Sequence, residues 1–394
     1  TLDERLFVIA EHINQGAELV APQERAAFAE VNRRAGLRAL ASAAYAPANE
    51  YLTAALALSG EKVWDGDRSA AMALYTEAAR AAYLAGDIPA MAERIATVRD
   101  RASNPLDRVP VLEIEVMHTI GTGDLLGAIT LARGTLVELG VDHPAEPTQQ
   151  DVEAGLMATL GALGAMGPAE VSALPANNDP RVAAAMRLQI DISSAAYLAQ
   201  PMLLPLLSFR LVQSTLTHGV TRESPYGFGL LALFLSAINM CDVAMAQGDN
   251  ALALVERFGD RSLRTRPCHL VYGFVHHWNM PVRDMLENEL SVYYCGIETG
   301  DIEYGCWGAH MYCGALFYAG VDLPKVAREL ATYSARMTHY QQLAQLNVTI
   351  QFTQATRNLM GLAEDPTRLV GPGFDEQALL EAYKATKYRG AVFV

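Results

Sequence analysis

Aromatic residues make up only 8% of the 394 residues, and β-branched residues are sparse and scattered. Pleated sheets are enriched in these residue types, so their scarcity argues against a β-rich fold. Alanine and leucine supply most of the 51% hydrophobic share, and both favour helices. The sequence therefore predicts an all-α chain.

Positive charge is in deficit, with 30 basic residues against 44 acidic ones and a formal net charge of −14. The densest basic stretch, Arg257 to Arg266, is interleaved with Glu256 and Asp260, which is typical of a solvated helix end. A phosphate backbone would be repelled by such a chain. We therefore expect no nucleic-acid partner.

Long apolar runs are missing too, since Phe228 to Ile238 falls short of the roughly 18 to 20 residues of a membrane span. The N-terminus, with Leu6, Ile9 and Ile13 at helical spacing, is unlike a secretory signal. The five cysteines are odd in number and confined to the C-terminal half, which argues against a disulfide framework. We expect a soluble cytoplasmic protein without a membrane span.

Signatures of catalysis are also lacking. There is no G-x-x-x-x-G-K-[ST] phosphate loop, no H-R-D or D-F-G kinase pair, no G-x-S-x-G and no H-E-x-x-H. We therefore expect this segment not to be an enzyme and to carry no cofactor.

What the chain does contain is a repeated helix-turn-helix rhythm. In the clearest copy, Tyr75 to Ala102, Gly86-Asp87 marks the turn between two apolar-periodic segments. Gly123-Asp124 marks the next copy 37 residues later, and the pair recurs at Gly248-Asp249 and Gly300-Asp301. Glycine can end a helix in the left-handed conformation, and aspartate can cap the next one. The period predicts a tetratricopeptide-like (TPR-like) superhelix, a solenoid of antiparallel helix pairs.

The rhythm breaks between about residues 142 and 181, where His143 to Pro147 and Asn177 to Pro180 are rich in proline and turn residues. We expect a boundary near residue 170, with an N-terminal repeat array over 1–170 and a C-terminal array over 171–394. A loop from Glu364 to Gly373 precedes a last helix starting near Asp375. The apolar ending YRGAVFV has no polar capping helix, so we expect the chain to be truncated from a longer one.

Several separated blocks resemble one region of a known kind of protein. They are RLFVIAEHINQGAELV from Arg5, VWDGDRSAAMALYTEAARAAYLAGD from Val63, FVHHWNMPVRDML from Phe274, GIETGDIEYGCWGAHMYCGALFYAG from Gly296 and DPTRLVGPGFDE from Asp365. The chain resembles the helical-repeat segment of large bacterial and fungal signalling proteins. These carry a Ser/Thr-kinase-like domain, a STAND-type ATPase, the repeats, a GAF domain and a sensor histidine kinase or cyclase.

The resemblance implies a repeat segment without the catalytic domains, none of which lies in these residues. The chain departs from the family's pattern at Ala46-Pro47-Ala48, which interrupts a helix that is continuous in the relatives.

Cys306, His310 and Cys313 follow i, i+4, i+7 spacing and share one helix face, with Cys295 on the preceding helix. Thiolates and imidazole suit zinc, which makes these residues a candidate metal site. Structural zinc sites draw close cysteine pairs from loops, which are missing here. The interpretation favoured by the sequence is therefore buried thiols in a helix seam.

His276, His277 and Trp278 with Pro281 form a second candidate, because two imidazoles beside an indole could recognise a ligand. The alternative is that Trp278 anchors a helix joint and Pro281 opens the next helix. A third set is aromatic and includes Tyr304 and Trp307, which are core residues at helical spacing or binding residues if exposed. Its full membership is Tyr293, Tyr294, Tyr304, Trp307, Tyr312, Phe317 and Tyr318.

Two functional hypotheses follow. The first is a scaffold or sensor that binds a protein or peptide, including other domains of the same polypeptide, or a small-molecule ligand, and relays this to flanking ATPase and kinase domains. The second is an all-helical enzyme with a central polar cavity. Its side chains would be His276, His277, Glu298 and Glu303.

Overall fold

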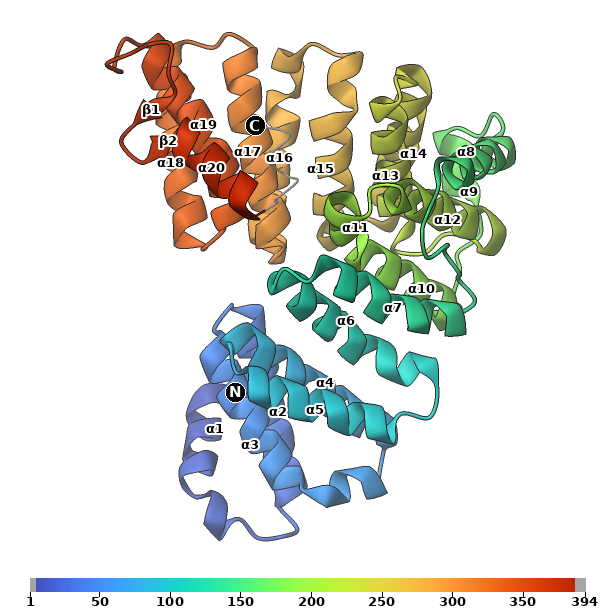
Figure 1. Cartoon of the computed structure of the whole chain (residues 1–394). Coiled ribbons are helices and arrows are strands. Elements are labelled where there is room, and N and C mark those ends of the chain that lie inside the picture. The colour runs from blue at the N-terminus through green and yellow to red at the C-terminus, as the bar shows by residue number, and fades with distance from the viewer. Residues whose placement is uncertain (1–4, 387–394) are drawn as a thin grey trace. The chain divides into compact units, whose positions relative to one another are not determined.

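The computed structural model describes residues 5–386, which are mostly α-helical (Figure 1). The strands among them are β1 (Val370–Gly371) and β2 (Phe374–Asp375), which pair antiparallel. The predicted all-α class is therefore confirmed for the described residues. The short hairpin was not predicted.

The chain divides into two compact units between Asp142 and His143, called here unit 1 and unit 2. The division falls at the start of the proline-rich break. The boundary expected near residue 170 lies instead inside helix α9 (Pro168–Ala173), which packs against a later helix of unit 2.

Unit 1 is a run of helices in which each packs against the next along the chain. Its α-helices are α1 (Leu6–Gln15), α2 (Arg25–Ala41), α3 (Tyr45–Ser59), α4 (Arg68–Ala85), α5 (Ile88–Arg101), α6 (Pro105–Gly121) and α7 (Leu125–Glu138). In addition, α2 packs on α4 and α4 on α6. The helix break falls at Ser42 to Ala44, whereas Ala46-Pro47-Ala48, where the sequence predicted an interruption, lie inside the first turn of α3.

Unit 2 begins with α8 (Gln149–Leu163), α9, α10 (Pro180–Asp191) and α11 (Ser193–Ala199). A regular run follows, consisting of α12 (Leu203–His218), α13 (Ser224–Ala237), α14 (Cys241–Phe258), α15 (Thr265–Phe274), α16 (Val282–Thr299), α17 (Ile302–Tyr318), α18 (Leu323–His339) and α19 (Leu343–Leu359). Figure 1 shows α13 to α19 side by side. Within this run α13 packs on α15, α15 on α17 and α17 on α19, and we call these four helices the odd row.

Three of the four Gly-Asp pairs form the predicted turns. Gly86, Gly123 and Gly300 have φ of 79°, 87° and 83°, the left-handed region that favours glycine. Asp87 and Asp124 then accept hydrogen bonds from the backbone amides of Ala90 and Gly127 and so cap α5 and α7.

The fourth pair, Gly248-Asp249, is a correction, because it lies in the middle of the continuous helix α14. A Cβ at Gly248 would lie 3.1 Å from Cγ1 of Val271 on α15. Glycine at this position therefore accommodates close helix packing, and the same residue pair that signals a turn elsewhere does not signal one here.

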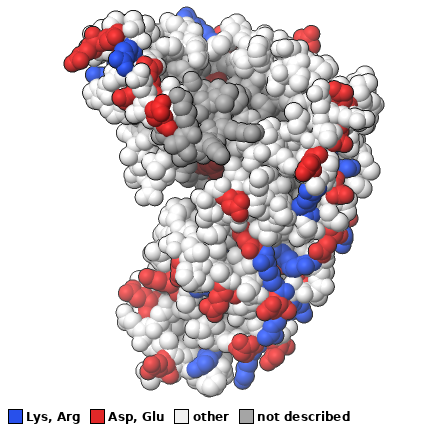
Figure 2. Space-filling view, viewed as in Figure 1, with Lys and Arg blue, Asp and Glu red and all other residues white. Residues whose placement is uncertain are grey.

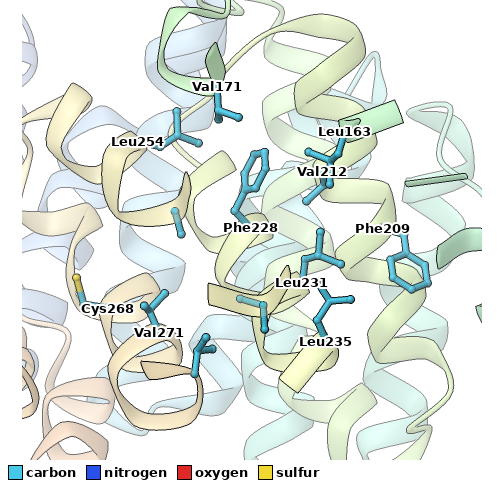
Figure 3. Close-up of a cluster of buried hydrophobic side chains, with 14 of the residues drawn as sticks. Leu163, Val171, Phe209, Val212, Phe228, Leu231, Leu235, Leu254, Cys268 and Val271 are labelled. Carbon is cyan, nitrogen blue, oxygen red and sulfur yellow. The ribbon is translucent and has the colours of Figure 1, made fainter. Parts of the chain in front are cut away.

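Each unit has its own buried core. In unit 1 the cluster around Ile95 and Ile114 joins α4, α5 and α6. In unit 2 the cluster of Figure 3 brings Leu163 and Val171 from α8 and α9 against Phe228 of α13 and Val271 of α15. Burial of apolar side chains thus holds α8 and α9, which follow the break, against the regular run of helices.

The predicted last loop and helix are present, with α20 spanning Glu376–Thr386. The loop is held by two buried amides of α19. Asn358 Nδ2 donates to the carbonyl of Arg368 at 2.6 Å, and Gln354 Nε2 donates to that of Val370 at 3.1 Å. The terminal YRGAVFV, on which the expectation of truncation rests, lies outside the described residues.

Candidate functional site

The odd row places a set of aromatic and imidazole side chains on neighbouring helices. We call this set the aromatic strip. Its members are Arg266 and His269 of α15, Tyr304, Trp307 and His310 of α17, and Phe352 of α19. All but His269 are partly exposed, so the strip offers surface as well as contributing to packing.

Helical spacing produces the strip. Arg266 and His269 are three residues apart on α15, and the same spacing separates Tyr304 from Trp307 and Trp307 from His310 on α17, so consecutive members lie next to each other on the helix surface. The two helices pack directly against each other. Side chains from both helices therefore meet along their shared seam.

At one end of the strip, the guanidinium of Arg266 lies over the ring of Tyr304, with Cζ 4.7 Å from the ring centroid. Arg266 Nε also donates to Oδ2 of Asp301 at 2.9 Å. Asp301 thus uses its carboxylate to hold Arg266 rather than to cap α17, unlike the aspartates of the earlier turns. Stacking and ion pairing together fix the guanidinium in place.

The two imidazoles of the strip are uncharged at neutral pH. Burial lowers the pKa of His269 to about 3 and that of His310 to about 4. His269 packs edge-on against Tyr304 at a centroid distance of 5.6 Å, and its Nδ1 is buried without a hydrogen-bond partner. His310 Nδ1 lies 3.0 Å from Oγ1 of Thr349, and its ring is 5.9 Å from that of Phe352. Such a wall can stack on apolar or planar groups and offer polar contacts without net charge.

Sequence reasoning named Tyr304 and Trp307 as binding candidates, and the structure places both in the strip. It did not single out His269, and it assigned Arg266 to a solvated helix end. A usable signal was present, because Arg266 and His269 are three apart just after the start of a helix. Only the fold, however, brings them beside Tyr304.

The other candidate surface, His276 to Trp278, forms a 3-10 turn after α15. His276 is buried with neither ring nitrogen hydrogen-bonded, and burial lowers its pKa, although Asp249 opposes this from 3.9 Å away. His277 and Trp278 are exposed, with ring centroids 5.0 Å apart. The turn is therefore a small aromatic surface separate from the strip.

The polar cavity imagined for an enzyme is not assembled. Glu303 lies in the first turn of α17, whose N-cap Asp301 contacts Arg266 near the start of α15, and Glu298 pairs with Arg261 at 2.5 Å. His276 and His277 follow the opposite end of α15, which spans ten residues or about 15 Å. The two glutamates and two histidines do not converge.

The cysteine and histidine face of α17 behaves as a seam. Cys306 and Cys313 are buried in the cluster that α17 shares with α18, and burial raises their pKa values to about 11 and 12. Both are therefore protonated thiols at neutral pH. In the described part of the chain, no three His, Cys, Asp or Glu side chains are placed to hold a metal ion.

Charges give no basic surface on the face seen in Figure 2, where Lys and Arg alternate with Asp and Glu over the described residues. Individual pairs account for much of the basic stretch. Arg264 pairs with Glu256 at 2.6 Å, and Arg257 donates to the carbonyl of Leu174. Within residues 5–386, no helix combines the length and the apolarity needed to cross a bilayer.

Comparisons with known proteins show a distant similarity to a signalling protein. No protein-family profile matches the chain. A stretch of 177 residues, 44% of the chain, is 22% identical to hybrid signal transduction histidine kinase G of Dictyostelium discoideum, and it covers 5% of that protein. The chain is thus distantly similar to a small part of a large signalling protein.

Proposed function

We propose that this chain is a non-catalytic scaffold or sensor segment of a multidomain signalling protein, and that its aromatic strip recognises a protein or peptide segment. The presence or absence of this bound segment is then relayed to flanking ATPase and kinase domains. The observation that carries this proposal is the strip itself, in which partly exposed rings from α17 and α19 lie in contact with Arg266 and the buried His269 of α15.

A TPR-like solenoid is the architecture that we propose for each unit. Its support is the packing of every second helix, α4 on α6 in unit 1 and α15 on α17 in unit 2, together with the Gly-Asp turns. In a solenoid each repeat contacts mainly its neighbours, so a ligand that spans several helices can change their relative packing. That is a physical route from recognition to a neighbouring domain.

The signalling context rests on two observations. Several stretches of the sequence resemble the repeat segment of large signalling proteins, and part of the chain is similar to a signalling histidine kinase. By this proposal the strip receives part of the same polypeptide, such as the ATPase region that precedes repeats of this kind. The distribution of polar groups favours binding over catalysis, since the glutamates and histidines of the enzyme hypothesis are separated along α15.

Calorimetric titration of the purified chain with the ATPase region of its parent polypeptide tests this function. The two variants Trp307→Ala and Trp278→Ala make the same chemical change, one in the strip and one in the separate turn. We expect Trp307→Ala to weaken binding by about tenfold or more, because aromatic anchors dominate interfaces, and Trp278→Ala to leave it unchanged. Loss of binding only in Trp278→Ala would move the site to the turn, and turnover of a small metabolite without any protein binding would refute the scaffold.

A further inference from the structure

A groove of about 470 Å³ runs between α5 and α6 in unit 1, far along the chain from the aromatic strip. On α5 it is lined by the partly exposed Ile88, the exposed Ala92 and Ala96 and, towards the helix end, Arg99 and Asp100, with the core residues Met91 and Ile95 as its floor. These positions recur every three or four residues and so share one face of α5. The groove is therefore elongated along a helix rather than rounded.

The dimensions fit a helix. From Ile88 to Asp100 the lining of α5 covers about three turns, or ~18 Å. Ala92 and Ala96 are both exposed, and their short side chains allow another backbone to approach closely. An incoming helix could therefore pack at the ~8 to 10 Å axis separation of ordinary helix pairs.

The polar groups of the groove do not suit a small molecule. Sites for small ligands carry a few convergent polar groups that fix orientation. Here Arg99 is ion-paired with Glu115, the ring of His118 packs edge-on against Tyr83, and no described lining side chain holds a buried polar atom without a partner. The groove therefore offers apolar contact along one face of α5, at Ile88, Ala92 and Ala96.

The charge at one end of the groove indicates which side chain of a partner would fit there. Asp100 is exposed at the end of the groove near the C-terminus of α5, between Arg99, which is ion-paired with Glu115, and Arg101, which is ion-paired with Glu61. The carbonyl end of a helix is also electronegative. The unbalanced charge at this end of the groove is therefore negative, and its complement is a lysine or arginine.

We propose that the α5–α6 groove docks one amphipathic helix of a partner protein. The partner helix carries apolar side chains three or four residues apart, followed by Lys or Arg at the end that meets Asp100. This is a second interaction surface, in a different unit from the strip and independent of what the strip binds.

The test uses the whole chain and a phage-displayed library of helices about 16 residues long, with one face randomised. We expect the selected helices to share the apolar spacing and a terminal basic residue. Ala96→Phe fills the groove from an exposed position and should weaken their binding by about tenfold or more. Methyl NMR signals of Ile88, Met91 and Ile95 should shift on addition of a selected peptide.

Reversing the charge at residue 100 tests whether the groove selects helices with a terminal basic residue. Asp100→Lys should weaken the basic peptides several-fold and strengthen versions in which Glu replaces the terminal Lys, whereas the matched exposed change Glu50→Lys on α3 should do neither. If no selected helix loses affinity in Ala96→Phe, or if Asp100→Lys and Glu50→Lys act alike, the proposal is wrong. It also fails if the chain self-associates and Ala96→Phe makes it monomeric, because a second copy would then occupy the groove.

Discussion

At the scale of single residues, the structure contains buried ionisable groups whose effect on the free energy of unfolding can be measured. Glu289 of α16 is only 5% exposed, its Oε2 has no hydrogen-bond partner, and burial raises its pKa to about 8. The sequence offered no sign of this, because Glu289 follows Glu287 in an ordinary amphipathic pattern. Its burial depends on which helices cover that face.

Glu289 should make stability depend on pH. Its folded pKa lies above the unfolded value of about 4.3, so between these values the unfolded chain releases a proton that the folded chain keeps. Stability is unaffected by this group below pH 4 and falls as pH rises towards 8, by at most about 1.4 kcal/mol per pH unit. Urea unfolding of the wild type and of Glu289→Gln should therefore show the variant gaining relative stability from pH 5 to pH 8. An unchanged difference between the two proteins would contradict the burial of an unpaired carboxyl.

Arg94 of α5 is the corresponding buried cation in unit 1. It donates to Oδ1 of Asn49, Oγ1 of Thr53 and the carbonyl of Ala78, at 2.6 to 2.7 Å. A lysine cannot reproduce this fork. We expect Arg94→Lys to lower the free energy of unfolding by about 2 kcal/mol in urea titrations, against less than about 0.5 kcal/mol for the exposed control Arg80→Lys. Equal effects would show that the fork contributes nothing.

At the scale of elements, the helices and several turns were predictable because their signals are local. Apolar spacing and the Gly-Asp pairs at Gly86, Gly123 and Gly300 need only neighbouring residues to act. Gly248-Asp249 was misassigned because its glycine serves a contact with Val271, which is distant in sequence. The aromatic strip was half predicted for the same reason, since Tyr304 and Trp307 stand out alone whereas Arg266 and His269 matter only beside them.

The crossing of α16 and α17 gives the sharpest element-scale prediction. A Cβ on Gly296 would lie 2.5 Å from the Cα of Gly305, so the two backbones must separate if one is added. We expect Gly296→Ala to destabilise the protein by about 2 kcal/mol or more. Gly161→Ala in α8 meets nothing within 4 Å and should stabilise by about 0.5 to 1 kcal/mol. Thermal unfolding of both variants measures these changes in stability. A Gly296→Ala protein as stable as the wild type would refute the close crossing.

At the scale of the whole molecule, the two units have separate cores, such as the cluster around Ile95 in unit 1 and that around Phe228 in unit 2. A fragment of residues 1–142 should therefore fold on its own. Circular dichroism should show a helical spectrum and a cooperative melt. A fragment that stays unfolded would mean that its stability depends on unit 2.

By the proposed function, the chain recognises a protein segment through the aromatic strip. Hydrogen–deuterium exchange of the chain, alone and with the ATPase region of its parent polypeptide, tests this most directly. We expect slower exchange in residues 265–274 and 302–318, the helices that carry most of the strip, with little change in α8. Protection confined to other helices, or none at saturating partner, would contradict it.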